Sequence, residues 1–98
     1  MNNTIFYIDI NIQTPEGPTQ YGRFELGQDR ESANELFKKL KGSPAVDPRD
    51  MLFIELVEIV NGLPVNIDVL TCDLQQLGTN AMLITQEVFK IYCLRAGK

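Results

Sequence analysis

The sequence predicts an α+β fold: a single-layer, mostly antiparallel four-stranded sheet with helices packed on one face, in the order ββα-ββα(α). Three features support this prediction. Apolar and polar side chains alternate over residues 5–14, apolar side chains recur at helical spacing over residues 29–41, and Asn61-Gly62 is a strong two-residue hairpin signal. The 98 residues leave room for one core, so we expect a single small α+β domain over residues 1–98.

The first strand is expected over residues 5–14. Its alternation places one set of side chains on the core face of the sheet, namely Phe6, Ile8, Ile10 and Ile12. The next residues, 15–20, include two prolines and a glycine, which predict a long loop. A second strand follows at about residues 21–26 with Phe24 and Leu26 inward, and the two strands are expected to form a hairpin.

Residues 29–41 have the pattern of an amphipathic helix. Asp29 can cap the free amides of the first turn, and Glu31 adds negative charge there. Lysines gather at the other end, where the helix dipole is negative, and Gly42 follows as a stop. One face of this helix is apolar and is expected to meet the core through Ala33, Leu36, Phe37 and Leu40.

The segment 48–60 is ambiguous. After a loop at residues 43–50, the pair Asp47-Pro48 resembles the start of a helix that would run to residue 60. Against a helix stand the Asn61-Gly62 turn signal and the β-rich residues 63–71 beyond it. We therefore favour a second hairpin and keep the helix as the alternative.

A two-residue turn at Asn61-Gly62 also predicts the register of the second hairpin. The expected cross-strand pairs are Val60 with Leu63, Leu56 with Ile67, and Ile54 with Val69. One face then becomes an apolar core layer that consists of Leu52, Ile54, Leu56, Val65, Ile67 and Val69. The same register places Glu55 opposite Asp68, which is an unfavourable pair of like charges.

The rest of the chain is predicted to be helical in two pieces. A short helix, capped by Thr71 or Asp73, is followed by a final helix that reaches about Leu94. Thr85 can start this final helix, because apolar residues on either side of it have the spacing of a hydrophobic staple. We therefore expect a break or kink near residues 83–85.

Composition excludes several classes of function. Asp and Glu outnumber Lys and Arg by 13 to 9, giving a net charge of -4, which weighs against binding to a phosphate backbone. The sequence has no histidine, which removes histidine-based nucleophile pairs, imidazole metal sites and a histidine pH switch. Nucleotide phosphate-binding motifs are also missing. We therefore expect no nucleic-acid partner, no metal and no cofactor.

A membrane partner and secretion are not expected either. No run of about 18 apolar residues occurs, as a transmembrane helix requires, and the N-terminus lacks the positive charge of a secretory signal. The two cysteines, Cys72 and Cys93, do not form a CxxC pair. We expect both to be reduced, buried thiols in a cytoplasmic protein.

Few residues suit catalysis in a chain without histidine, and we assign no catalytic residue. Cys72 lies between a predicted strand and a predicted helix, where backbone amides can lower the pKa of a thiol. Acids on the outward sheet face could converge as an acid–base pair or a cation site, the candidates being Asp9, Glu25, Glu55 and Asp68. The alternative function is therefore a small enzyme or ligand-binding protein that uses carboxylates or Cys72. It predicts either a concave site in which at least two acids converge, drawn from these four and Asp73, or a reactive Cys72.

Surplus apolar side chains indicate the leading function. The outward sheet face is predicted to hold a candidate interface made of Tyr7, Tyr21, Phe53, Val57 and Ile59. The C-terminal helix has a related surplus at Met82, Phe89 and Cys93. Such faces are typical of protein contacts, most simply with a second copy of the chain. The leading prediction is thus a small, acidic, cytoplasmic, non-catalytic protein-binding or adaptor module that acts as a homodimer.

Overall fold

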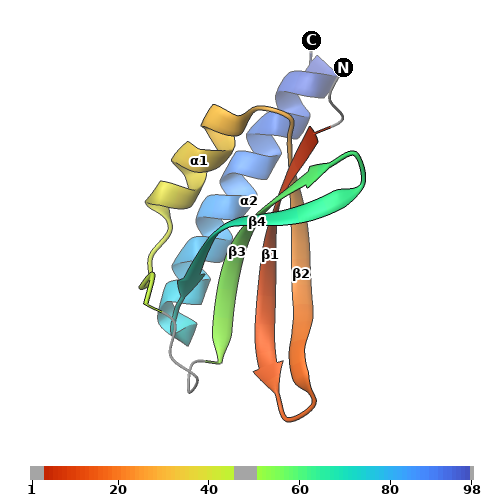
Figure 1. Ribbon diagram of the computed structural model, residues 1–98. Helices are drawn as coiled ribbons and strands as arrows, with labels where there is room; N and C mark the ends of the chain where they lie inside the picture. Colours follow the sequence, from red (N-terminus) through yellow and green to blue (C-terminus); the bar gives the residue numbers. More distant parts are fainter. Residues whose placement is uncertain (1–3, 46–50, 98) are drawn as a thin grey trace.

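The computed structural model describes residues 4–45 and 51–97, with side chains described as far as Cys93. Its elements follow the order ββα-ββα and are β1 (Thr4–Thr14), β2 (Gly17–Gly27), α1 (Arg30–Lys39), β3 (Leu52–Val60), β4 (Leu63–Thr71) and α2 (Leu74–Gly97). The strands form one antiparallel sheet in the spatial order β2-β1-β3-β4. Both helices lie on the same face of this sheet (Figure 1). The predicted α+β fold class is confirmed.

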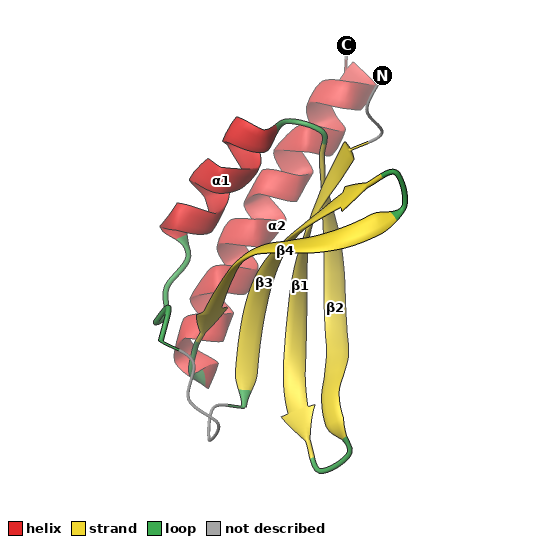
Figure 2. Cartoon of the chain, viewed as in Figure 1, coloured by secondary structure: helices red, strands yellow, loops and turns green. Residues whose placement is uncertain are grey.

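The core lies between the sheet and the two helices. Alternate residues of β1 face it, since Phe6, Ile8 and Ile10 are almost fully buried. The predicted apolar face of α1 is confirmed, and α2 adds Ile84, which is completely buried. The opposite face of the sheet has no helix on it in the described part of the chain (Figure 2). We call it the helix-free face.

The prediction of a long loop between the first two strands is wrong. Only Pro15 and Glu16 separate β1 from β2, and Gly17 takes a φ of +118°, a conformation that suits glycine. The Thr14 hydroxyl donates to the Gly17 carbonyl at 2.7 Å and accepts from the Glu16 amide at 3.3 Å. Pro18 does not interrupt pairing because β2 is an edge strand, where a missing N–H is tolerated.

The helix α1 begins and ends close to the predicted residues. The Asp29 carboxylate accepts a hydrogen bond from the Glu31 amide at 3.2 Å and another from the Ser32 hydroxyl at 2.5 Å. At the other end the Leu40 amide donates to the Phe37 carbonyl at 3.1 Å. The predicted N-cap is confirmed, and its physical basis is the free amides of the first turn.

The hairpin interpretation of the second half is confirmed, and the alternative helix over residues 48–60 is wrong where the chain is described. Residues 52–60 are strand, whereas residues 46–50, which hold the Asp47-Pro48 signal, lie outside the described residues. Asn61 and Gly62 have φ values of 52° and 85°, as a type I′ turn requires.

The predicted register is correct near the turn and wrong beyond it. Val60 pairs with Leu63 as expected, and the regular pairing continues to Val57 with Asn66. A β-bulge then inserts one extra residue, Ile67, into β4. From this point each partner moves by one position, so the observed pairs are Leu56 with Asp68, Glu55 with Val69, and Ile54 with Leu70.

The bulge changes which side chains of β4 reach the core. Leu70 packs against the core cluster in place of Val69, and Ile67 still reaches it. Val65 is half exposed to solvent, so two members of the predicted core layer, Val65 and Val69, are not part of the core. The shift also separates Glu55 from Asp68 as direct neighbours, which removes a repulsion that the regular register would impose.

The predicted break near residues 83–85 is wrong, because α2 is one helix (Figure 1). Its start is fixed by a reciprocal cap: the Gln76 amide donates to the Asp73 carboxylate at 2.7 Å, and the Asp73 amide donates to the Gln76 side chain at 3.0 Å. Thr85 is exposed and does not act as a new cap. In the described part of the chain no helix has the length and apolar character that a bilayer crossing requires.

Candidate functional site

The five residues of the predicted interface do not form one exposed patch. Tyr21, the extra residue of a bulge in β2, is 69% exposed, whereas Val57 is only 2% exposed. The other three, Tyr7, Phe53 and Ile59, are half-buried. The helix-free face is therefore partly covered by the chain itself, and only some of these residues are available to a partner.

An arginine covers the part of the helix-free face where β1 meets β2. The Arg23 guanidinium lies 4.7 Å from the centre of the Tyr7 ring and grips Asp9 with two hydrogen bonds of 2.8 Å. Hydrogen bonding to Asp9 raises the pKa of Arg23 above its ordinary value. Asp9 is 5% exposed and is thus a paired, buried carboxylate, not the solvated acid that the sequence suggested.

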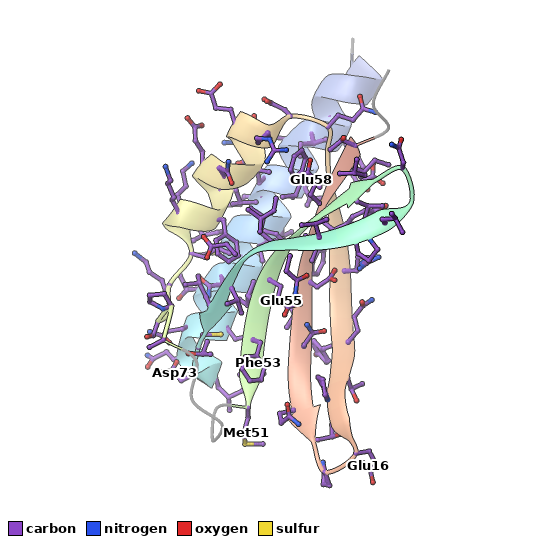
Figure 3. All side chains as sticks on the ribbon, in the orientation of Figure 1. Glu16, Met51, Phe53, Glu55, Glu58 and Asp73 are labelled. Carbon is purple, nitrogen blue, oxygen red and sulfur yellow. The ribbon has the colours of Figure 1, made fainter. Side chains whose placement is uncertain are left out.

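A groove of about 420 Å³ crosses the helix-free face, and we call it the sheet groove. All four strands contribute to it, with the lining residues Asn11, Gln13, Pro18, Phe53, Glu55, Asn66, Ile67, Asp68 and Val69. Phe53 and Glu55 lie on the part of β3 that β4 leaves uncovered in the view of Figure 3. The groove is thus a concave feature, and two of the candidate acids, Glu55 and Asp68, are among the residues that line it.

The bulge in β4 explains how the sheet groove forms. Successive side chains of a strand point to opposite faces of the sheet. Leu52 and Ile54 are buried on the face that the helices cover, so Phe53 and Glu55 lie on the helix-free face. The register shift at Ile67 brings Val69 opposite Glu55, where the regular register would place a second carboxylate. Bulges bend and twist a strand, so the edge strand β4 curves relative to the rest of the sheet.

The sheet groove combines apolar surface with negative charge. The Glu55 carboxylate accepts a hydrogen bond from the Asn11 side-chain amide at 3.0 Å, and the Asp68 carboxylate accepts one from the Val69 amide at 2.9 Å. Both donors are neutral, and no Lys or Arg is among the residues that line the groove. On the helix-free face the groove therefore offers apolar surface beside the Glu55 carboxylate, which already has a neutral partner in Asn11.

The other candidate acids lie elsewhere. Glu25 is outside the sheet groove, and Asp73 caps α2 through its carboxylate. Among the described residues, acids and cysteines nowhere gather in a group of three that could hold a metal ion. Glu55 and Asp68 are both among the residues that line the sheet groove, but Asp68 pairs with the buried Leu56, so its carboxylate leaves the sheet on the opposite face from that of Glu55.

The two thiols differ from the sequence predictions. Burial raises the pKa of Cys72, the charge of Asp73 raises it further, and only a hydrogen bond with Asn80 acts in the opposite direction. The lowered pKa that would mark Cys72 as a reactive thiol is therefore not found. Both cysteines are free, and Cys93 is exposed where burial was expected.

A second apolar surface lies on the outer side of α2. Four large apolar residues there are 77%, 55%, 70% and 47% exposed, namely Leu74, Met82, Phe89 and Tyr92, and we call them the outer row. From Met82 the row continues through Thr85, Phe89 and Tyr92 in alternating steps of three and four residues, so these side chains share one helix face. The surplus that the sequence indicated is thus real, and an unbroken helix keeps it in solvent.

Sequence reasoning missed most of the sheet groove. Asn11, Gln13 and Asn66 have ordinary positions on predicted strands, and nothing local distinguishes them. The one available signal was the repulsion of Glu55 and Asp68 in a regular register, which favours a bulge between them.

Comparisons of the chain with protein-family models, with curated proteins and with solved structures find no match.

Proposed function

We propose that the protein is a non-catalytic protein-binding module that acts as a homodimer, with the outer row of α2 as the shared surface. The observation that carries this proposal is the exposure of the row. Phe89 is 70% exposed and Leu74 is 77% exposed on a helix whose other side packs on the core. Contiguous apolar surface of this kind is unfavourable in water unless another chain covers it.

The spacing and charge of α2 favour a second copy as the partner. Steps of three and four residues between Met82, Thr85, Phe89 and Tyr92 are the pattern by which two helices pack along a seam. No Asp, Glu, Lys or Arg occurs between Leu74 and Gln86, so two copies can meet there without like-charge repulsion. A two-fold axis then uses the same surface on both copies.

The state of Cys72 supports a non-catalytic role. A raised pKa keeps the thiol protonated near neutral pH, and a protonated thiol is a poor nucleophile. The sequence has no histidine that could accept its proton.

Sedimentation equilibrium over a range of concentrations tests the proposal. We expect a concentration-dependent dimer that Phe89→Lys and Met82→Glu convert to a monomer, because each substitution places a charge in the seam. Tyr21→Lys is the matched control, since Tyr21 is 69% exposed and belongs to β2, so the substitution adds a charge at an exposed aromatic residue outside the outer row.

Two results would contradict the proposal. The first is a monomer at every concentration up to the millimolar range. The second is a dimer that Tyr21→Lys dissociates and Phe89→Lys does not, which would place the interface on the sheet. Circular dichroism of each variant separates loss of dimer from loss of fold.

A further inference from the structure

We infer that the two copies pack their α2 helices antiparallel, in a register that seats Phe89 of each copy against Gly78 of the other. This inference rests on the proposed function, because it requires the outer row to be the shared surface. It adds the direction of the partner helix and the contact that fixes its register.

Gly78 extends the face of the outer row by one turn. It precedes Met82 by four residues, so helical spacing places it on the same face as Met82 and Phe89. Gly78 is exposed, and a Cβ atom added to it would meet nothing within 4 Å. A second helix can therefore approach the backbone closely at this point. Phe89, about three turns further along, instead projects a large ring that is 70% exposed.

The sizes of these side chains suit a copy that runs in the opposite direction. Gly78 and Phe89 are equally far in sequence from the midpoint of the segment 82–85, whose ends are Met82 and Thr85. A two-fold axis at this midpoint places Gly78 opposite Phe89 of the other copy, and Met82 opposite Thr85. Each layer of the seam then combines one large and one small residue, so the two helices can stay at a constant distance.

A parallel pair would pack the same residues less evenly. Every residue would face its own copy, so two Gly78 residues would meet in one layer and two Phe89 rings in another. Close approach at the glycines leaves too little room for the rings, and a separation that suits the rings leaves a void at the glycines. Size complementarity therefore favours the antiparallel pair.

The charges on α2 favour the same direction. Residues 74–86 contain no Asp, Glu, Lys or Arg, whereas Glu87 and Lys90 follow in the next turn. Antiparallel packing lays this charged part beside the uncharged segment of the other copy, so like charges stay apart. It also places the positive N-terminal end of each helix dipole near the negative C-terminal end of the other.

The distance between spin labels on the two copies tests the direction of the helices. Cys93 is exposed and can be labelled in the Cys72→Ala protein. At a rise of about 1.5 Å per residue, the roughly ten residues between Cys93 and the two-fold axis separate the two labels by about 30 Å along an antiparallel seam. Pulsed electron–electron double resonance measures this distance.

A label near the two-fold axis is the matched control. Gln86→Cys, in a protein that also carries Cys72→Ala and Cys93→Ser, places the label only about three residues from the axis, so the two labels should be about 20 Å closer along the seam than those at Cys93. A parallel pair would give the same short distance at both positions, because its helix axes would lie about 10 Å apart throughout.

A substitution at Gly78 tests the contact itself. Gly78→Phe fills the space that Phe89 of the other copy would occupy, and it should raise the dimer dissociation constant by about tenfold or more in sedimentation equilibrium. Gly78→Phe combined with Phe89→Ala restores one large and one small residue in each layer and should recover most of the affinity. Circular dichroism of dilute protein, in which the monomer predominates, shows whether each variant folds.

The outcomes distinguish this inference from the proposed function. A monomer at every concentration contradicts both. A dimer with equal, short distances at residues 86 and 93, or a dimer that Gly78→Phe tightens, overturns the antiparallel contact and leaves the proposed function standing. A long distance at residue 93, a short one at residue 86 and weakening by Gly78→Phe support the antiparallel contact.

Discussion

Asn80 is a buried polar residue that the helical pattern of the C-terminal segment does not single out. It is fully buried on α2, where its side chain accepts from the Lys41 amide at 2.6 Å and donates to the Lys41 carbonyl at 2.7 Å. The Asn80 side chain thus pairs with both backbone groups of Lys41, as a neighbouring strand would, and fixes the position of the segment that follows α1. A buried amide is tolerated here because both of its polar atoms have partners.

Asn80→Ala should lower the free energy of unfolding by about 2–4 kcal/mol, because it leaves the amide and carbonyl of Lys41 without their partner. Urea denaturation measures the change. Thr79→Ala is the matched control, since Thr79 is the exposed neighbour and its hydroxyl makes only a 3.5 Å contact with the Gln75 carbonyl. Equal loss of stability in both variants would contradict the role of Asn80.

The two thiols should differ in reactivity. We expect iodoacetamide to modify Cys93 faster than Cys72 by on the order of tenfold near neutral pH, because burial hinders access to Cys72 and lowers its thiolate fraction. Mass spectrometry of partly alkylated protein measures the ratio, with Cys93→Ser isolating the slower thiol. Faster modification of Cys72 would contradict the burial of its thiol.

The pH dependence of Cys72 follows from the direction of its shift. Because the folded-state pKa is raised, the contribution of this thiol to stability is complete below its ordinary pKa of about 8.5 and is lost as pH rises through the folded pKa. Denaturation of the Cys93→Ser protein should therefore show stability that falls on the alkaline side. Cys72→Ala in that background should reduce the slope, and an unchanged slope would assign it to other groups.

At the scale of elements, α2 shows how tertiary packing outweighs local sequence signals that favour a break in a helix. Gly78 weakens a helix and Thr85 can start one, so the sequence favours two pieces. In the structure Leu77, Ile84 and Ile91 recur every seven residues and all contact the core, which only a continuous helix allows. Tertiary contacts along the whole length thus outweigh two local signals that favour interruption.

Two glycines give opposite predictions because their surroundings differ. Gly78 lies in α2 with nothing within 4 Å of an added methyl group, so Gly78→Ala should raise stability by about 0.5–1 kcal/mol. Gly42 has a φ of +152°, and an added Cβ would lie 2.5 Å from the Thr71 carbonyl oxygen, so Gly42→Ala should lower stability. Thermal unfolding measures both, and a shift of the same sign in the two variants would contradict this assignment.

At the scale of the whole molecule, two arginines hold elements together around the sheet. Arg23 joins β2 to β1 through Asp9, and Arg30 joins α1 to β3 through Glu58. The Arg30 guanidinium also lies 5.3 Å from the centre of the Phe6 ring. The two carboxylates are buried while the arginines remain partly exposed, so each arginine neutralises a charge that the fold has taken from water.

Arg30→Ala should lower the free energy of unfolding by about 1–2 kcal/mol, because Glu58 would remain buried without a partner while the partly exposed side of the pair limits the effect. Chemical denaturation measures this change. Lys38→Ala, on the exposed side of the same helix, is the control and should change stability by less than about 0.5 kcal/mol. A double variant, Arg30→Ala with Glu58→Gln, should recover part of the loss, and no recovery would contradict the pairing.

The sequence alone determined the order of the elements and the fold class. Three features made this possible: the alternation in β1, the capped helix α1 and the Asn61-Gly62 turn. Each depends on residues a few positions apart, and such local preferences can be predicted from the sequence alone. The turn also determined the register of β3 and β4 as far as Val57. The apolar surplus of α2 was visible for the same reason, since helical spacing is local.

The tertiary structure decided which residues meet. The bulge at Ile67, the burial of Val57 and the pairing of Asp9 with Arg23 each depend on neighbours in other strands. The sheet groove is the clearest case, because its lining comes from all four strands and the bulge places Val69 opposite Glu55 and moves Asp68 opposite Leu56. Cross-strand contacts are set by the total packing of the sheet, and the local preferences of a segment do not specify them.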